Sequence, residues 1–562
     1  MAERSIKKIG ELMREFDYIS EDELEEILRL KQNSNTDKKL SELLVDLDYI
    51  TEEELVKVLK FQTGLPHADL SEYYLDSELT RHVPENIARR HLAVPLEKDD
   101  EVLRIAMVDP TDLIAIDDIE RVSGFNVKPM IGAPGEVKNA LDWLYREEDI
   151  DINKFLDEFK DEIQEQEEED FAEDELREMV EEAPIVKLAN TIISRAYKKG
   201  ASDIHIEPEE DYLRVRYRID GVLQEEMTAP KSSQRALVSR FKIIANLDIT
   251  EHRIPQDGKI RTKIKGNKID MRVSTLPTVK GEKVVVRLLS KDTDLLQLDN
   301  LGFSEDNLQL LRRLINKPHG ILLLTGPTGS GKSTTLFASL NEINEPSINV
   351  TTIEDPVEYQ LEGVYQVQAK PKAGLTFART LRSILRQDPD IIMIGEMRDE
   401  ETAEIGVRAA LTGHLVFSTL HTNDAVSSVT RLIDMGLPSY LVSSSLIGVV
   451  AQRLVRKLCP DCKQKVKLNK KDREFLETEE IKEAYTSVGC NTCSETGYRG
   501  RLALQEIFQI DDEIKELISE EVSEKRLKKA ALKRGMKTLK QDGIRKLKMG
   551  KTDIAELKRI IF

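Results

Sequence analysis

Gly326-Pro-Thr-Gly-Ser-Gly-Lys-Ser333 is the most informative motif in this 562-residue sequence. It follows the apolar run Ile321–Leu324, which predicts a buried strand, and it leads into the helix-compatible residues 333–337. Glycines let a backbone curl so that its N–H groups face a bound anion, and the N-terminus of the following helix adds positive charge. A strand, a loop of this composition and a helix in that order predict a phosphate-binding loop.

The ligand predicted for this loop is a nucleoside triphosphate, ATP or GTP. Lys332 is placed to reach the β- and γ-phosphate oxygens, and Ser333 is placed to ligate Mg²⁺. The nucleotide-binding residues expected from the motif are Gly326, Pro327, Thr328, Gly329, Ser330, Gly331, Lys332, Ser333 and Thr334.

Acidic clusters follow two further predicted strands, 350–353 and 391–394. They lie in Thr352-Ile-Glu-Asp-Pro-Val-Glu358 and in Gly395-Glu-Met-Arg-Asp399. Strands alternating with helices predict a parallel α/β sheet, and ligands of such sheets bind at the C-terminal ends of the strands. Carboxylates at that edge bind Mg²⁺ or take a proton from an attacking water. Either cluster alone would also fit a helix N-cap, but two beside a phosphate loop favour catalysis.

Two of the eight histidines, His414 and His421, flank the apolar run 415–420, which predicts another strand. A single histidine in such a place is more often structural than functional. Because this pair belongs to the nucleotide sheet, we expect it to sense the γ-phosphate.

The four cysteines form two Cys-x-x-Cys pairs, Cys459 with Cys462 and Cys490 with Cys493, with 27 residues between the pairs. Each pair can bind a metal from a tight turn, and four thiolates complete a tetrahedral Zn²⁺ site. Redox disulfides and unligated thiols are the competing interpretations. In a reducing compartment structural zinc is favoured, and a site with four thiolates has no open position for catalysis.

The N-terminal part of the chain contains an internal repeat. Residues 9–28 and 40–59 are identical at nine of twenty positions. Each copy predicts a helix that begins with a capping box, Ser20 with Glu23 and Thr51 with Glu54. The apolar stripes that follow consist of Leu24, Ile27 and Leu28 and of Leu55, Val58 and Leu59. Residues 1–64 are therefore expected to form a small helical packing unit.

An α/β module and an acidic linker are expected next. Residues 65–146 predict the module, with a strand at 103–108 and a helix at 134–145. Residues 147–183 are the linker, and 147–182 hold 19 Asp and Glu against 3 Lys and Arg, a net of −16 out of −20 for the chain. Such a stretch predicts a solvated, partly helical linker, with recognition of a basic partner as the alternative.

Residues 184–295 predict a second α/β domain, with a helix at 185–199 and strands at 202–207 and 212–219. On the second strand Arg214, Arg216 and Arg218 share one face, because strand side chains alternate. The row is either a solvated face or an anion-binding surface.

Residues 296–562 form the predicted nucleotide domain. It includes the cysteine element 459–493 and C-terminal helices in 511–562. The stretch 525–551 is basic, which predicts either a solvated face or a docking surface.

Together these motifs resemble the secretion ATPases of type II secretion and type IV pili. The phosphate loop, 352–358, 386–399 and 412–421 resemble the family's Walker A, aspartate, Walker B and histidine boxes. Residues 200–220 and 255–287 resemble its second N-terminal domain. The paired Cys-x-x-Cys motifs and the tail 535–552 resemble the assembly branch, since retraction ATPases lack the zinc element and the long N-terminal region.

The resemblance implies a multidomain α/β protein. It would have a RecA-like P-loop ATPase core, a PAS-like α/β N-terminal domain, a zinc-binding insertion and a helical N-terminal region. It also implies a ring-shaped homohexamer that hydrolyses ATP and moves an inner-membrane platform protein to assemble type IV pili, with ATP, Mg²⁺ and Zn²⁺ as cofactors. The type II secretion motor, which has the same boxes, is the neighbouring alternative.

Site roles follow from the same resemblance. Glu358 would be the general base, and Glu396 with Ser333 would support Mg²⁺. His414 and His421 would read the state of the γ-phosphate. The arginine fingers would be Arg272 and Arg287, with Arg218 as a further candidate, because such residues neutralise charge in the transition state.

The repeat resembles, imperfectly, a cyclic-di-GMP-binding motif of some family members. That motif opens with Arg-Leu-Gly and has a second glycine seven residues further on. Here the openings are Lys8-Ile-Gly10 and Lys39-Leu-Ser41, and Asp17 and Asp48 stand where the second glycines would be. Lysine does not make arginine's bidentate contact with guanine, and aspartate repels phosphate. The sequence therefore predicts no tight binding of cyclic-di-GMP.

Composition predicts a globular cytoplasmic protein, and the resemblance implies that it works at the inner face of the membrane, which it reaches only through the platform. No apolar run approaches ~18 residues, and the N-terminus lacks the apolar core of a signal peptide. Two other classes compete. A nucleic-acid translocase is disfavoured because no concentrated basic surface carries interleaved aromatics, and DNA-stimulated hydrolysis would revive it. A nucleotide-gated regulator is disfavoured by the acidic boxes and arginines, and turnover assays would decide.

Overall fold

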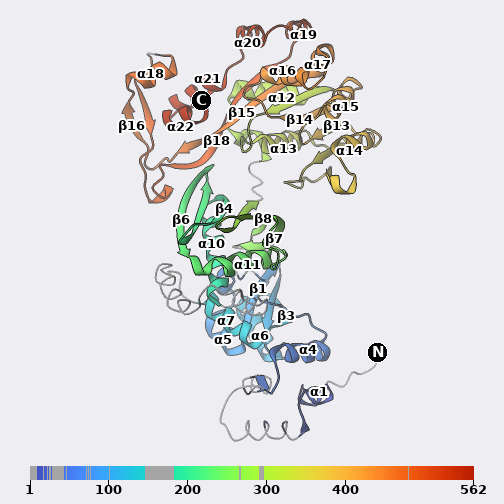
Figure 1. Ribbon diagram of the computed structural model, residues 1–562, viewed down its shortest axis with the longest axis vertical. Coiled ribbons are helices and arrows are strands. Elements are labelled where there is room, and N and C mark those ends of the chain that lie inside the picture. The colour runs from blue at the N-terminus through green and yellow to red at the C-terminus, as the bar shows by residue number, and fades with distance from the viewer. Residues whose placement is uncertain are drawn as a thin grey trace. The chain divides into compact units, whose positions relative to one another are not determined.

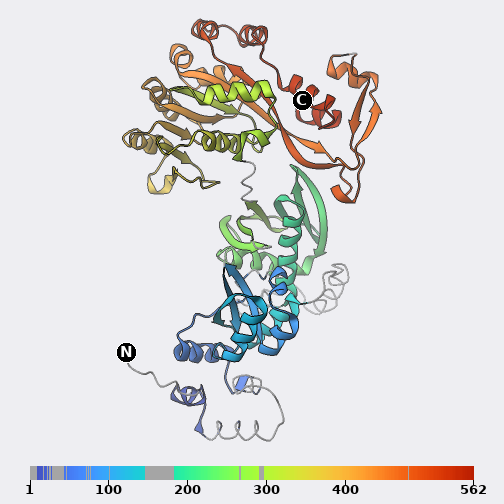
Figure 2. The same ribbon diagram turned by 180° about the vertical axis from the view of Figure 1, so that it is seen from behind.

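The computed structural model describes three long stretches of the chain. They are 51–145 apart from 71, 72, 74, 76 and 100, 183–289 apart from 265 and 266, and 296–561 apart from 479. Before residue 51 it describes 9–16, 18–21, 23, 27, 44, 45, 47, 49 and 50. The chain divides into two compact units, Met1–Ser290 and Lys291–Phe562 (Figures 1 and 2). The acidic segment 147–182, with its expected linker, lies outside the described residues.

Both predicted capping boxes are confirmed. Thr51 precedes α4 (Glu52–Thr63); its hydroxyl accepts the Glu54 N–H at 3.3 Å, and the Glu54 carboxylate accepts the Thr51 N–H at 2.8 Å. Ser20 and Glu23 make the same reciprocal pair, at 3.3 and 2.7 Å. Each box satisfies two N–H groups that a helix start would otherwise leave unpaired.

The apolar stripes of the repeat lie in one small core. Leu55, Val58 and Leu59 are buried, and so is Ile27 of the first copy. Leu24 and Leu28 lie outside the described residues. The same core includes Ile131 and Ala133, so the repeat packs on the module that follows it.

The module after the repeat is a three-stranded sheet with helices. Its strand order is β1 (Ala93–Asp99), β2 (Val102–Met107) and β3 (Asn126–Ile131), antiparallel and then parallel. The helices are α5 (Glu85–His91), α6 (Leu113–Ser123) and α7 (Pro134–Leu144). The predicted strand and helix at 103–108 and 134–145 correspond to β2 and α7.

The second sheet of this unit has six antiparallel strands. Their order is β6 (Val222–Pro230), β5 (Tyr212–Ile219), β4 (Ala201–Pro208), β9 (Gly281–Leu289), β8 (Asn267–Thr278) and β7 (Gln256–Ile264). Helices α10 (Ala183–Lys198) and α11 (Gln234–Ile244) share one core with alternate strand residues. The predicted helix at 185–199 and strands at 202–207 and 212–219 are confirmed.

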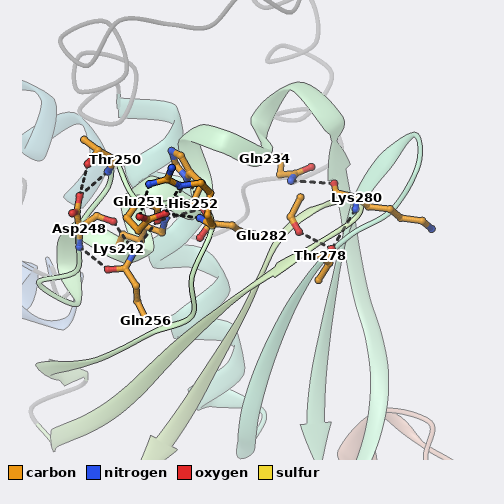
Figure 3. A network of polar contacts seen from close by, with 12 residues as sticks. Gln234, Lys242, Asp248, Thr250, Glu251, His252, Gln256, Thr278, Lys280 and Glu282 are labelled. Carbon is orange, nitrogen blue, oxygen red and sulfur yellow. Dashed lines mark hydrogen bonds and ion pairs between the residues drawn. The ribbon is translucent and has the colours of Figure 1, made fainter.

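A buried lysine ties the loop before β7 to the start of β9 (Figure 3). The ammonium group of Lys242 donates to the Glu282 carboxylate at 2.8 Å and to the Glu251 carbonyl at 2.9 Å. His252 Nδ1 lies 2.6 Å from the same Glu282 oxygen. The Lys242 side chain is 0 % exposed and that of Glu282 is 8 % exposed. Because a charge taken out of water needs a partner, this pair fixes the loop.

We expect Lys242→Met to destabilise the first unit. The change leaves the Glu282 carboxylate buried with His252 but without the lysine. Removal of one partner of a buried ion pair typically costs about 3–5 kcal/mol. In calorimetry of the full chain, the unfolding transition of the first unit should occur at a lower temperature than in the wild type. Lys280→Met is the matched control, because Lys280 pairs with Glu209 at 2.7 Å on the surface, where such pairs contribute about 0–1 kcal/mol. Equal shifts in the two variants would contradict the prediction.

The second unit contains a seven-stranded sheet with helices on both faces (Figure 1). The strand order is β12 (Val364–Gln368), β11 (Val350–Glu354), β13 (Ile391–Ile394), β14 (Leu415–Leu420), β10 (Gly320–Thr325), β15 (Leu446–Leu458) and β18 (Tyr498–Gln509). Neighbouring strands are parallel, except that β18 is antiparallel to β15. The four strands predicted in this region are confirmed as β10, β11, β13 and β14.

Two apolar cores lie on the two faces of this sheet. Helices α12 (Glu305–Ile315) and α13 (Lys332–Ile343) contribute to one core. The other core includes α14 (Phe377–Ile384), α15 (Glu400–Leu411), α16 (Ser427–Asp434) and α17 (Ser439–Ser445), and it continues into the cysteine element and the tail helices. Strand β10 is buried at every position and feeds alternate side chains into both cores.

The cysteine element and the tail complete this unit. The element has a hairpin of β16 (Gln464–Lys467) and β17 (Glu483–Thr486), with α18 (Lys470–Leu476) between the strands. The tail helices are α19 (Asp512–Ser519), α20 (Glu524–Lys533), α21 (Leu539–Lys548) and α22 (Ile554–Ile561). Several tail cations have acidic partners within the chain: Lys528, Arg534, Lys537, Lys540 and Lys546. Among the described residues, no helix is both long and apolar enough to cross a bilayer.

Candidate nucleotide site and cysteine cluster

The phosphate loop connects the C-terminal end of β10 to the first turn of α13. Gly329 and Gly331 have φ angles of 77° and 86°, a left-handed conformation that favours glycine. Gly326 packs closely against its neighbours. A Cβ at this position would lie 2.5 Å from the Gln452 carbonyl oxygen and 2.6 Å from Ser330 Oγ. The predicted glycines are thus required by backbone angle at two positions and by close approach at the third.

Two polar side chains of the loop fit a phosphate ligand. Lys332 is 9 % exposed, and its ammonium group donates to the carbonyls of Gly326 at 2.8 Å and Pro327 at 3.1 Å. Burial lowers the pKa of Lys332, and the nearby Glu396 carboxylate opposes that shift. Ser330 Oγ is buried and has no hydrogen-bond partner among the described residues. The Lys332 ammonium is buried and donates to neutral carbonyls, and the Ser330 hydroxyl has no partner in the described part of the chain. A bound phosphate would accept hydrogen bonds from both groups.

Glu396 lies just past β13, beside Arg398 and His421. Arg398 is 2.5 Å from Glu396 Oε1, and His421 Nε2 is 3.7 Å from Oε2. Strands β13, β14 and β10 are parallel neighbours, so their C-terminal ends meet at one edge of the sheet, as the sequence predicts. Its carboxylate is 15 % exposed and lies at the C-terminal edge of the sheet, where ligands of such sheets bind.

The two glutamates of the predicted aspartate box are in different surroundings. Glu354 is 4 % exposed and accepts hydrogen bonds from the Thr352 hydroxyl at 2.5 Å and the Gln366 amide at 2.9 Å. Burial raises the pKa of Glu354. Glu358 is exposed. Glu354 is therefore engaged in packing β11, and Glu358 is the glutamate that is accessible to water.

His414 and His421 lie at opposite ends of β14. His421 follows the strand and lies beside Glu396, whereas His414 precedes it, with Nδ1 2.8 Å from the Ala409 carbonyl oxygen. β14 runs parallel to β10 with Thr325 opposite Leu420. Six strand residues span about 20 Å. The structure therefore brings His421, but not His414, to the phosphate loop of the same chain.

The three arginines predicted as fingers lie in one row across the six-stranded sheet. Arg218, Asp203, Arg287 and Arg272 are successive register partners on β5, β4, β9 and β8. Residues directly opposite in antiparallel strands point to the same face. Asp203 accepts a hydrogen bond from Arg287 at 2.9 Å and lies 3.6 Å from Arg218. Asp203 was not among the predicted site residues, because its place between two arginine-bearing strands becomes visible only from the strand register.

The other arginines of the β5 row pair with acids of their own sheet. Arg216 forms two hydrogen bonds to the Glu207 carboxylate, at 2.7 and 2.8 Å, and Arg214 lies 2.6 Å from Glu209. Burial acts to raise the pKa of Glu207, but bonds from Arg216 and Lys283 outweigh it and lower that pKa to about 2. On β5 the arginine row is largely neutralised by these carboxylates.

The four cysteines form one cluster, as predicted. All four Sγ atoms lie within 4.8 Å of one another, and three of the separations are 3.9, 3.8 and 3.7 Å. Zinc–thiolate bonds of about 2.3 Å in a tetrahedron place the sulfurs about 3.8 Å apart. The N–H groups of Cys490 and Gly497 point at Cys493 Sγ, at 3.2 and 3.1 Å, which suits a thiolate. The donor set therefore fits a structural zinc ion.

The parallel sheet, the phosphate loop at its centre and the acids at its edge define a P-loop ATPase. A family model described as type II/IV secretion system protein matches residues 178–559, and a model described as MshEN domain matches residues 63–151. The first model matches more than half of the chain, and this match shows that the chain belongs to that family.

Similar proteins agree with this assignment. The chain is 43 % identical over 509 residues to the type IV pilus assembly ATPase PilB of Myxococcus xanthus, covering 88 % of this chain and 89 % of that protein. It is 43 % identical over 486 residues to the type II secretion system ATPase E of Vibrio cholerae, covering 85 % and 96 %. The structure of the ATPase DotB from Yersinia pseudotuberculosis has a TM-score of 0.51 at 22 % identity, covers 66 % of this chain and 92 % of that one, and shares its fold.

The chain belongs to the type II/IV secretion system protein family and is a P-loop ATPase of the kind found in pilus assembly and type II secretion. The predicted resemblance, the α/β multidomain fold class and the ATPase activity are confirmed.

Proposed function

We propose that this chain is the hexameric motor ATPase that drives assembly of type IV pili. The observation that carries the proposal is the meeting of Lys332, Glu396 and His421 at one edge of the sheet, around a loop with an unpaired buried hydroxyl. The similarity to the Myxococcus xanthus assembly ATPase, over most of both chains, supports pilus assembly. Type II secretion is the second candidate, because the Vibrio cholerae relative is equally identical.

Each site residue has a proposed role in hydrolysis. Residues 326–334 would hold the phosphates, with Ser333 and Glu396 supporting Mg²⁺, which neutralises charge on the phosphate oxygens. Glu358 would take the proton of the attacking water, and His421 would respond to the γ-phosphate. Arg272, Arg287 and Arg218 would supply positive charge to the transition state. His414 is left out, since it lies at the other end of β14.

The proposed partners are further copies of this chain and an inner-membrane platform protein. A hexameric ring at the cytoplasmic face would act on that platform, and no nucleic acid is required. The proposed domain division remains that of the sequence: 1–64, 65–146, 147–183, 184–295 and 296–562.

Zinc is the proposed occupant of the cysteine cluster. We expect one zinc ion per chain by elemental analysis. Cys493→Ser removes the sulfur that faces two N–H groups, so the protein should lose its zinc on dialysis against a weak chelator. Thr492→Ala, at an exposed neighbouring position, should keep it. A cluster that stays metal-free after expression in zinc-rich medium would refute the assignment.

Cyclic-di-GMP is not a proposed ligand. The prediction rests on Lys8, Lys39, Asp17 and Asp48, which lie outside the described residues. It stays a prediction, and saturable binding at micromolar ligand in calorimetry would overturn it.

Glu358→Gln tests the hydrolytic site. It removes the proposed base and keeps the size of the side chain, so we expect ATP to bind and kcat to fall about 10²–10⁴-fold. Steady-state hydrolysis and nucleotide binding should be measured on hexamers sized by light scattering. Asp355→Asn, also exposed in the same box, is the matched control and should retain most of the activity. Unchanged hydrolysis in Glu358→Gln would move the base elsewhere, with Glu396 next.

A gene deletion separates the two candidate functions. In the organism that carries this chain, loss of surface pili with an unchanged set of secreted proteins would support pilus assembly. Loss of secreted proteins with normal pili would establish the secretion alternative. Restoring the lost property with the wild-type chain, but not with Glu358→Gln, would link it to ATP hydrolysis.

A further inference from the structure

Strand β15 contacts the phosphate loop through one buried amide. Gln452 is 2 % exposed, and its Nε2 donates to the Ser330 carbonyl at 2.8 Å. Its Oε1 accepts the Thr335 hydroxyl at 2.9 Å. Thr335 lies on α13, directly after the loop, and is 1 % exposed. A single side chain therefore joins the loop and the helix that follows it to the neighbouring strand of the sheet.

The orientation of this amide is fixed by its surroundings. The Ser330 carbonyl is only an acceptor, so the group that faces it must be the NH₂ of Gln452. The Oε1 of Gln452 is then left to accept from Thr335, whose hydroxyl has a proton to give. Both contacts are buried, and loss of either partner would leave a polar group unpaired.

The contact with Ser330 sets the direction of an N–H group in the loop. The peptide unit between Ser330 and Gly331 is planar and trans, so its C=O and N–H point in opposite directions. Because Gln452 holds the C=O toward β15, the Gly331 N–H is turned away from β15. In a phosphate loop the N–H groups are the ligands of the anion.

The backbone at Gln452 is itself held from two sides. Arg453 donates to the Gln452 carbonyl at 3.1 Å and to the Asn423 carbonyl at 2.9 Å. The Gln452 carbonyl oxygen also lies 2.5 Å from where a Cβ of Gly326 would be. The amide is therefore anchored by backbone that packs against the first residue of the loop.

We propose that Gln452 is a positioning residue of the nucleotide site, which acts by holding the Ser330–Gly331 peptide so that the Gly331 N–H binds phosphate. The inference rests on the ATP site proposed above. Gln452 itself does not touch the nucleotide; it determines how well the loop is prepared before ATP arrives. An unpositioned loop must be ordered when ATP binds, and that lowers affinity.

Gln452→Leu tests this by removing both hydrogen bonds at similar size. We expect the Kd for Mg·ATP, measured by calorimetry on the full chain, to rise about 10-fold. The N–H contact exists in ground and transition states alike, so KM should rise with little change in kcat. Gln505→Leu is the matched control. Gln505 is 0 % exposed and lies directly opposite Gln452 on β18, but it contacts Lys546 and the Leu301 carbonyl.

Gln452→Glu gives a readout that a merely structural role would not move. A protonated glutamic acid has the shape of glutamine, one donor for Ser330 and one acceptor for Thr335. An ionised carboxylate has no donor and repels the Ser330 carbonyl and the phosphates. Burial raises a carboxyl pKa, so the ratio of the Kd of Gln452→Glu to that of wild type should fall toward one as pH falls from 8 to 5.5.

The outcomes separate this inference from the function on which it rests. Failure of the wild type to bind ATP would refute the proposed function. Normal ATP binding by wild type, with an unchanged Kd in Gln452→Leu or a pH-independent ratio in Gln452→Glu, would refute the role of Gln452 alone. If Gln452→Leu does not fold, Thr335→Val still decides. It removes one of the two hydrogen bonds of the amide and should raise the Kd about 3-fold, about half of the effect of Gln452→Leu on a logarithmic scale.

Discussion

The nucleotide site depends on the position of β10. This strand is buried on both faces and paired on both edges. Its backbone groups bond to β14 and β15, and all six residues are buried. Ile321 and Leu323 enter one core, and Leu322 and Leu324 enter the other. A slip of one residue would exchange the two sets of side chains between cores that are already filled. The loop at 326–331 therefore starts from a fixed point, and the acids after β11 and β13 are placed relative to it by strand register.

Strand β15 extends that fixed frame to the cysteine cluster and the tail. It begins beside β10, passes the phosphate loop at Gln452 and ends at Leu458, one residue before Cys459. Its partner β18 starts at Tyr498, five residues after Cys493. The tail closes this end, because Glu556 accepts hydrogen bonds from the N–H and the guanidinium of Arg456. A metal ion in the cluster would thus link the end of β15 to the start of β18, and β15 also contacts the phosphate loop.

The sequence predicts the parts of this protein that depend on local pattern. Apolar runs before Gly326, Glu354, Gly395 and His421 place four strands of the nucleotide sheet, and Cys-x-x-Cys spacing predicts the cluster. Contacts that depend on register were not predicted. Asp203 joins Arg218 and Arg287 only because β4 lies between β5 and β9, and Gln452 reaches Ser330 only because β15 is the neighbour of β10. His414 and His421 are close in sequence, yet a strand between them separates them by its own length.

The turn after His421 connects the nucleotide site to both β15 and the tail. Asn423 accepts from Arg453, Asp424 pairs with Lys528 of α20 at 2.6 Å, and the Ala425 N–H donates to Glu506 of β18 at 2.9 Å. Burial raises the pKa of Glu506, so its ionised form depends on such N–H donors. A displacement of this turn would break these charge-assisted bonds, and the loss would cost most at Glu506, whose bond to Ala425 is buried. A movement at His421 that keeps these bonds would therefore carry β18 and α20 with it.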